Sequence, residues 1–199
     1  MAKIFKANII DRMTRSKLPS FEQRAESLAT SRFKRAKKQT LRAYDTDDVT
    51  LSIENKGFGG DAGLLNGKGS LWGFLGFESG SNPTSELRDY LDRNIKLSKG
   101  KRVRGRLQIA YKYETPSKSG IDSASPLPWT SKSWTSAIEQ GISGLERFIY
   151  FGKLSGSRSG FGLQAKNELR NAEMKTRPYM SRILGSFNET LEKLFSRRR

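Results

Sequence analysis

The chain has 199 residues, of which 35% are hydrophobic and 10% aromatic, so it is long enough and apolar enough to bury a core. It contains neither cysteine nor histidine, which excludes disulfides, Cys/His zinc sites and nucleophilic systems that use a histidine base. The 37 Lys and Arg against 20 Asp and Glu give a formal net charge of +17, which favours acidic partners such as nucleic acid or an acidic protein surface. No apolar run approaches the roughly 18 residues that a membrane span needs, so we expect no membrane partner.

The charge is unevenly distributed along the chain. Residues 1–44 carry 12 basic and 3 acidic side chains, whereas residues 45–100 carry 6 basic and 9 acidic ones. A basic segment followed by an acidic one suits head-to-tail contact between copies of the chain. The alternative is a basic face that is simply solvated.

The first 45 residues predict an arm followed by a helix. We expect residues 1–19 to form a mobile or partner-docked arm, because Pro19 and the residues before it interrupt any helix that begins earlier. The helix is predicted from Ser20, as the cap, to about Tyr44, with Gln23 completing a capping box. Its apolar stripe is Phe21, Ala25, Leu28, Ala29, Ala36 and Leu41, with Phe33 close to its edge.

Three aspartates follow, at positions 45, 47 and 48. Closely spaced carboxylates can bind hard cations, but the later glutamate of a calcium-binding loop is missing, and aspartates are ordinary turn formers. We therefore predict a turn. Val49, Leu51 and Ile53 then alternate with polar residues, which predicts a half-buried strand.

A glycine-rich stretch and an aromatic run come next. Residues 57–69 contain six glycines, but the glycine spacing and the residue after Lys68 do not fit a phosphate-binding P-loop, so a flexible loop is predicted. Residues 71–77, which include Trp72 and Phe74, suit a short buried strand whose glycines allow close approach of another group. Asn82 and Pro83 then begin a second helix with a buried face of Leu87, Tyr90, Leu91 and Ile95.

The longest strand pattern covers residues 101–113. Apolar and aromatic residues face one side, and Arg102, Arg104, Arg106 and Lys112 face the other. For a nucleic-acid-binding protein this row would follow a phosphate backbone, and for a structural protein it would be a subunit contact. The pattern leaves both interpretations open.

The last third of the chain predicts a loop, two helices and a glycine-rich connector. Residues 114–130 are expected to form an extended loop, and Ser133 to begin a helix that continues to Ile149. Residues 160–165 match dinucleotide-binding and RNA-binding patterns only weakly, because the required acidic and aromatic partners are missing. Pro178 is expected to open a final helix that buries Met180, Ile183, Leu184, Phe187, Leu191 and Leu194, before a basic end at residues 197–199.

Two blocks of sequence carry a resemblance to a known family. The first is residues 67–83, Gly-Lys-Gly-Ser-Leu-Trp-Gly-Phe-Leu-Gly-Phe-Glu-Ser-Gly-Ser-Asn-Pro. The second begins at Trp134 with Trp-Thr-Ser-Ala-Ile-Glu-Gln-Gly-Ile-Ser-Gly-Leu and ends at residues 171–179, Asn-Ala-Glu-Met-Lys-Thr-Arg-Pro-Tyr. With the order of helix, sheet and closing helix, residues 20–195 resemble the small basic tail-completion and neck proteins of tailed bacteriophages.

The resemblance implies an α/β subunit of the α+β type, with a mainly antiparallel sheet flanked by helices and with long loops. We expect an N-terminal arm at residues 1–19, a single domain at 20–195 and a basic tail at 196–199. Copies would form a ring in the neck or at the top of the tail of the virion, assembled in the host bacterial cytoplasm. The ring would join or complete head and tail and let DNA pass, with neck, connector or tail proteins as neighbours.

No catalytic residues, metal or cofactor are implied by this resemblance. Loops at residues 57–70, 114–130 and 152–162 would meet neighbouring subunits, and the last would be ordered mainly by that contact. The expected subunit or partner contacts are Lys68, Trp72, Phe74, Arg102, Arg104, Arg106, Arg158, Phe161, Arg197 and Arg198. A non-catalytic basic nucleic-acid-binding protein is the alternative, and an enzyme is the least favoured class.

Overall fold

The structure is a computed structural model that describes residues 2–7, 18–55, 64, 71–102, 109–128, 130–143, 147–150, 162–165, 173–174 and 176–196. The fold is α+β, as predicted, and every strand pairing described is antiparallel. The chain divides into two compact units. The first unit is Met1–Arg42, Leu91–Ser117 and Ile183–Arg199, and the second is Ala43–Tyr90 and Lys118–Arg182.

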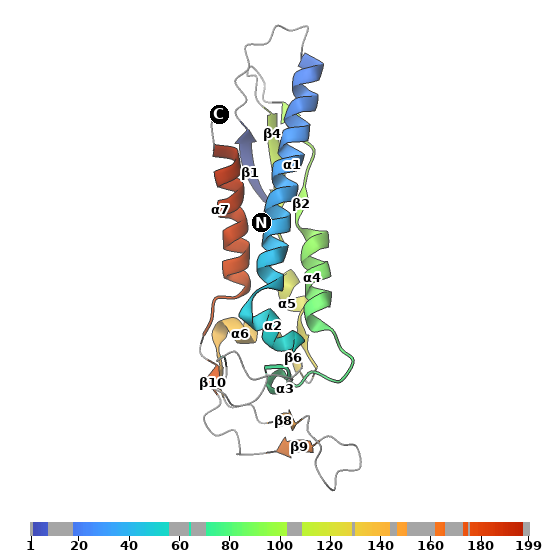
Figure 1. The fold of residues 1–199 in the computed structure, drawn as a ribbon, viewed down its shortest axis with the longest axis vertical. Helices are drawn as coiled ribbons and strands as arrows, with labels where there is room; N and C mark the ends of the chain where they lie inside the picture. Colours follow the sequence, from blue (N-terminus) through green and yellow to red (C-terminus); the bar gives the residue numbers. More distant parts are fainter. Residues whose placement is uncertain are drawn as a thin grey trace. The chain divides into compact units, whose positions relative to one another are not determined.

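The helices and strands follow in chain order (Figure 1). The helices are α1 (Leu18–Asp45), α2 (Asp48–Glu54), α3 (Leu71–Leu75), α4 (Pro83–Asn94), α5 (Lys118–Ser123), α6 (Trp134–Gln140) and α7 (Met180–Ser196). The strands are β1 (Ala2–Ala7), β2 (Lys96–Leu97), β3 (Lys101–Arg102), β4 (Ile109–Glu114), β5 (Pro126–Leu127), β6 (Thr130–Ser133), β7 (Ile142–Ser143), β8 (Arg147–Tyr150), β9 (Gly162–Ala165) and β10 (Glu173–Met174).

In the first unit, β4 is the central strand of a four-stranded sheet. It pairs with β1 along its whole length and with β2 and β3 on its other edge. Leu97 of β2 pairs with Tyr113, and Lys101 of β3 pairs with Ala110. Three residues lie between Leu97 and Lys101, but only two lie between their partners on β4, so residues 98–100 contain a β-bulge of one extra residue. Gly100 occupies this bulge, where an added Cβ would lie 2.5 Å from Ile109 Cγ2 and 2.6 Å from Tyr111 Cε1. Glycine is therefore required for close approach to the central strand.

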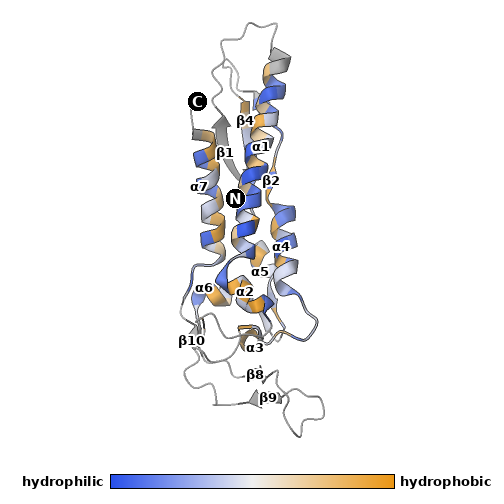
Figure 2. Cartoon of the chain, in the orientation of Figure 1, coloured by the Kyte–Doolittle hydropathy of each residue, from blue (hydrophilic) through white to orange (hydrophobic). Residues whose placement is uncertain are grey.

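Helices α1 and α7 supply much of the rest of the first unit's core. Phe21, Ala25 and Ala29 of α1 pack with Ile109 and Tyr111 of β4. From α7, the Phe187 ring meets the ring of Phe33 at 5.8 Å and that of Tyr113 at 5.9 Å, both in edge-to-face geometry. Figure 2 shows hydrophobic and hydrophilic residues in alternating bands along α1 and α7, as an amphipathic helix requires.

A series of aromatic rings forms the centre of the second unit. The ring centroids of Trp72 and Phe77 are 5.3 Å apart, those of Phe77 and Trp134 6.2 Å, and those of Trp134 and Tyr179 6.0 Å. Tyr44 continues the series at 6.1 Å from Tyr179. All five side chains are buried, so residues that are distant along the chain are held together by one aromatic core.

Two segments that were predicted as strands are helices. The alternation of Val49, Leu51 and Ile53 belongs to α2, in which Val49 and Ile53 are buried and Leu51 is 41% exposed. The strand prediction is wrong because Asp47 caps the segment: its carboxylate accepts the backbone N–H of Val49 at 3.0 Å, which initiates a helix. Residues 71–75 form the short helix α3, which is buried on all sides and therefore lacks the apolar periodicity of an amphipathic helix.

Three further predictions of extent are wrong. Residues 101–113 do not form one strand, because β3 turns back and pairs with β4. The expected loop at 114–130 instead contains α5, β5 and the start of β6. The helix that Ser133 caps ends at Gln140 rather than at Ile149, because Gly141 has a φ of 82° and closes the helix.

The N-terminal part of the chain also differs from the prediction. Residues 1–19 are predicted to form a mobile or partner-docked arm, but residues 2–7 are a strand that pairs with β4 of the same chain. Helix α1 begins at Leu18 instead of being capped by Ser20. Pro19 lies in the first turn, where a missing N–H costs no hydrogen bond. The predicted buried stripe of α1 is confirmed except at Leu28, which is 37% exposed, and α4 begins at Pro83 as predicted.

Candidate interaction surfaces

The outward face of the first unit's sheet carries basic side chains. Along β4, Ile109, Tyr111 and Tyr113 are buried, whereas Lys112 and Glu114 are exposed, which confirms the predicted alternation. Lys96 and Lys101 are also exposed and lie opposite Glu114 and Ala110. Since Glu114 lies in this row, with its carboxylate 3.6 Å from Lys112 Nζ, the sheet face has mixed charge.

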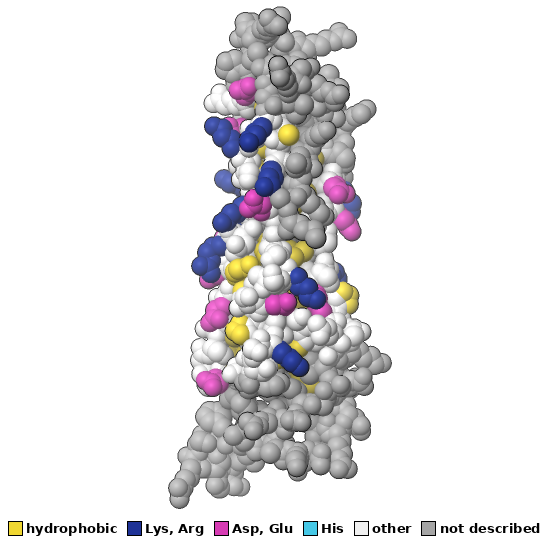
Figure 3. All heavy atoms as spheres, turned by 180° about the vertical axis from the view of Figure 1, so that it is seen from behind, with side chains coloured by type: hydrophobic (Ala, Val, Ile, Leu, Met, Phe, Trp, Pro, Cys, Tyr) yellow, Lys and Arg dark blue, Asp and Glu magenta, His cyan; other side chains and the backbone are white. Residues whose placement is uncertain are grey.

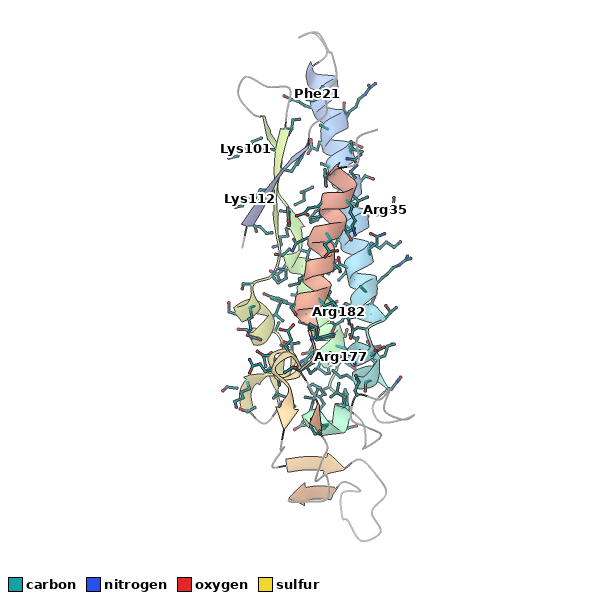
Figure 4. The ribbon with its side chains drawn as sticks, turned by 90° about the vertical axis from the view of Figure 1, so that its left-hand side faces the viewer. Phe21, Arg35, Lys101, Lys112, Arg177 and Arg182 are labelled. Atoms are coloured by element: carbon teal, nitrogen blue, oxygen red, sulfur yellow. The ribbon has the colours of Figure 1, made fainter. Side chains whose placement is uncertain are left out.

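A second basic surface follows the solvent side of α1. We define the α1 basic face as Arg24, Lys34, Arg35, Lys38 and Arg42, all of which are exposed. Arg24, Arg35 and Arg42 are separated by 11 and 7 residues, so they lie on one side of an α-helix with Lys38, and Lys34 lies beside them. Figure 4 shows Arg35 at the helical side of the first unit, and Lys101 and Lys112 on the other side, at its strands.

The acidic residues of α1 lie away from this face. Glu22 and Glu26 are each three residues before Ala25 and Ala29, so they share the side of α1 that packs on the sheet. Burial raises the pKa of the Tyr111 hydroxyl, and the charges of Glu26 and Glu22 raise it further. Two other basic residues of α1 have partners elsewhere. Lys37 Nζ is 3.0 Å from Asp92 Oδ1, and the Arg32 guanidinium lies 5.5 Å from the centre of the Phe195 ring.

The α1 basic face has a cost for the helix. Lys34 and Lys38, and Lys38 and Arg42, are like-charge pairs at i,i+4 spacing, and each pair destabilises a helix by about 0.2–0.5 kcal/mol. Among the described residues, Arg24, Lys34, Arg35 and Lys38 have no ion pair with a carboxylate. The face is therefore a concentration of one charge sign, unlike the surface in Figure 3, where Lys and Arg side chains lie among Asp and Glu.

Three ion pairs join described residues within the second unit. The turn predicted at residues 45–48 is confirmed, and each of its three aspartates contacts an arginine. Asp45 accepts two hydrogen bonds from Arg88 of α4, at 2.7 and 3.2 Å, and Asp48 accepts one from Arg177 at 2.7 Å. Asp47, which is 2% exposed, pairs with Arg182 of α7. Figure 4 shows Arg177 and Arg182 close together near the start of α7.

Buried hydroxyl groups form hydrogen bonds in the core of the second unit. The Tyr44 hydroxyl donates to the Thr84 carbonyl at 2.8 Å, and the Tyr179 hydroxyl lies 2.7 Å from Thr50 Oγ1. Burial raises the pKa of both tyrosines well above their ordinary value, so they stay neutral at physiological pH. These groups are hydrogen-bonded to one another or to the backbone inside a packed core.

The two units differ in total charge. The first unit contains 24 basic and 7 acidic residues, and the second contains 13 of each. The whole net charge of +17 therefore belongs to the first unit. This grouping differs from the predicted acidic segment at 45–100, because the fold combines that segment with basic residues from 118–182.

The predicted contact residues have different positions. Trp72 and Phe74 are 3% and 2% exposed and belong to the core, so they are not available to a neighbouring subunit. Arg102 lies in β3, where it pairs with Ile109. The other predicted residues lie outside the described part of the chain: Lys68, Arg104, Arg106, Arg158, Phe161, Arg197 and Arg198. The glycine-rich loops at 57–70 and 152–162 also lie outside it, apart from Leu64 and Gly162.

The α1 basic face was missed by sequence reasoning, which treated this helix only by its apolar stripe. The spacing of Arg24, Arg35 and Arg42 on the opposite side was sufficient to find it.

Comparison of the chain with family models, with curated proteins and with solved structures finds no match. Among the described residues, no group of three or more acidic side chains could hold a metal ion. No described helix is long and apolar enough to cross a membrane.

Proposed function

We propose that this protein is a non-catalytic virion structural protein of a tailed bacteriophage, which forms a ring in the neck or at the top of the tail. The ring joins or completes head and tail and lets DNA pass. The observation that carries the proposal is the separation of charge: the first unit holds all of the net positive charge, whereas the second has no net charge and pairs three of its aspartates with its own arginines. We therefore assign contact with acidic partners to the first unit and a structural role to the second.

The sheet of the first unit offers a means of association between copies. Within the described part of the chain, β1 pairs only with β4, so it forms an edge of the sheet. An edge strand presents backbone donors and acceptors that a neighbouring chain can pair with. A contact of this kind is head-to-tail when the strand meets a different surface of the next copy. Repeated head-to-tail contacts close into a ring when the rotation from one copy to the next closes, and form a filament when it does not.

The proposal is tested by the mass of the purified protein in solution. We expect multi-angle light scattering, over a wide range of protein concentration and up to high salt, to give a defined multiple of the 22.4 kDa chain. Negative-stain images should show rings. A species that remains a monomer at every concentration, alone and with head or tail particles of a tailed phage, would contradict the proposal.

A non-catalytic nucleic-acid-binding protein is the second candidate, because two basic surfaces of the first unit could contact phosphate. A monomer whose affinity for nucleic acid falls steeply with salt supports that candidate. A ring whose size does not depend on salt supports the structural role. The two measurements use the same preparation and can be compared directly.

A further inference from the structure

We propose that the α1 basic face is a binding surface for the phosphate backbone of double-stranded DNA. The face was defined above as Arg24, Lys34, Arg35, Lys38 and Arg42. The inference deepens the proposed function, and it rests on that function only for the choice of duplex DNA as the polyanion. It moves the expected phosphate contact from the sheet to the helix on the other side of the first unit.

The geometry of α1 suits an extended polyanion. From Arg24 to Arg42 the helix rises about 27 Å at about 1.5 Å per residue. Duplex DNA carries one negative charge for about every 1.7 Å of its axis, so a row of this length meets many phosphates. The row is also held in place, because the opposite side of α1 packs on β4 through Phe21, Ala25 and Ala29. A rigid row orders fewer groups on binding than a mobile tail does.

The charge balance favours an external partner over a second copy of this chain. A second copy would have to present an acidic surface, but the second unit has equal numbers of acidic and basic residues. Its aspartates at positions 45, 47 and 48 already contact Arg88, Arg182 and Arg177. The sheet is a weaker candidate for DNA because Glu114 lies among its lysines and contacts Lys112.

The experiment compares two variants that lose the same charge. In the first, Arg24, Lys34, Arg35 and Lys38 are each replaced by Gln, which keeps helix propensity. In the second, the control, Lys99, Lys118, Lys132 and Lys193 are replaced by Gln; these exposed residues lie outside α1. Binding of a fluorescent DNA duplex is measured by anisotropy across a salt series, and circular dichroism confirms that both variants fold.

We expect the slope of log affinity against log salt to become shallower by about 3 to 4 in the α1 variant, since each phosphate contact contributes about 0.9. The control should keep the wild-type slope and most of the affinity. Equal losses in both variants would overturn the inference, because total charge would then decide binding. An α1 variant with unchanged slope would also overturn it, and so would a wild-type protein that binds polyglutamate as tightly as DNA.

Light scattering on the same samples separates this inference from the proposed function. If the α1 variant loses DNA binding and keeps its assembled mass, both proposals stand. If the wild-type protein binds DNA through α1 but stays a monomer, the proposed ring is wrong and the proposed DNA-binding surface is supported. If the α1 variant binds DNA normally but no longer assembles, the face is a contact between copies and the inference is wrong.

Discussion

Asp45, Asp47 and Asp48 in the second unit each contact an arginine. On the solvent side of α1 in the first unit, by contrast, Arg24, Lys34, Arg35 and Lys38 form no ion pair with a carboxylate of the described residues. The second unit also joins its elements through a continuous series of aromatic rings and buried hydroxyls. The first has its core between a sheet and the helices that cover it. The comparison indicates that the three aspartates of the second unit are used in contacts that hold its own elements together. The like charges on one side of α1 do not stabilise that helix, and they suit an acidic partner.

Of the variants that test this comparison, Trp134→Ala should cause the largest loss of stability. The side chain is fully buried between Phe77 and Tyr179, and truncation of a buried Trp costs about 3–5 kcal/mol. We expect a corresponding loss in the free energy of unfolding, measured with urea, and faster amide hydrogen exchange in α6 and α2. Lys132→Ala, at an exposed position two residues earlier, is the control and should change stability by less than about 0.5 kcal/mol.

The next effect is expected in the first unit, from Gly100→Val. A Cβ at this position would lie 2.5 Å from Ile109 and 2.6 Å from Tyr111, so the bulge must open to admit the larger side chain. Overpacking of this kind costs about 1–3 kcal/mol, which thermal unfolding would detect. Gly185→Ala is a matched control, because a Cβ there meets nothing within 4 Å and alanine favours a helix. If both variants were equally stable, the close packing at the bulge would be disproved.

A smaller effect should distinguish the aspartates of the turn. Asp47→Ala removes the cap of α2 and the partner of Arg182, and we expect it to cost about 1–2 kcal/mol. Asp48→Ala removes an exposed contact with Arg177 and should cost less than about 1 kcal/mol. Denaturant unfolding of both variants checks the order. The reverse order would mean that the cap does not stabilise α2.

The buried tyrosines of the second unit predict a dependence on alkaline pH. Because burial raises the pKa of Tyr44 and Tyr179 in the folded protein, the unfolded chain loses these protons first, near its ordinary pKa of about 10. Stability should therefore be complete below that pH and fall as the pH rises above it. Unfolding followed by tyrosinate absorbance measures this fall. Tyr44→Phe with Tyr179→Phe should make it shallower, and an unchanged profile would contradict the assignment.

Elements with complete local signals could be predicted from the sequence. Asn82 and Pro83 begin α4, Ser133 caps α6, and the alternation along β4 gives its buried face. Elements that depend on distant contacts could not. Residues 2–7 form a strand only because β4, more than 100 residues later, pairs with them. Residues 49–53 match a strand in their alternation, and only the cap at Asp47 makes them helical.

The candidate surface was only partly predictable for a related reason. The basic residues of α1 could be counted in the sequence, and their spacing places them on one side of a helix. The sequence could not show that Arg177 and Arg182 contact the aspartates after residue 45, because these arginines are about 130 positions away along the chain. The separation of charge into two units follows from the fold rather than from the order of residues.

The most direct test of the charge separation is a lysine footprint. The full chain is treated with an amine-acetylating reagent with and without duplex DNA, and modification of each lysine is measured by mass spectrometry. Lys34 and Lys38 on the α1 basic face should be protected by DNA, while Lys118 and Lys132 of the neutral second unit should react equally in both samples. Equal protection of all four lysines, or protection confined to the second unit, would contradict the account.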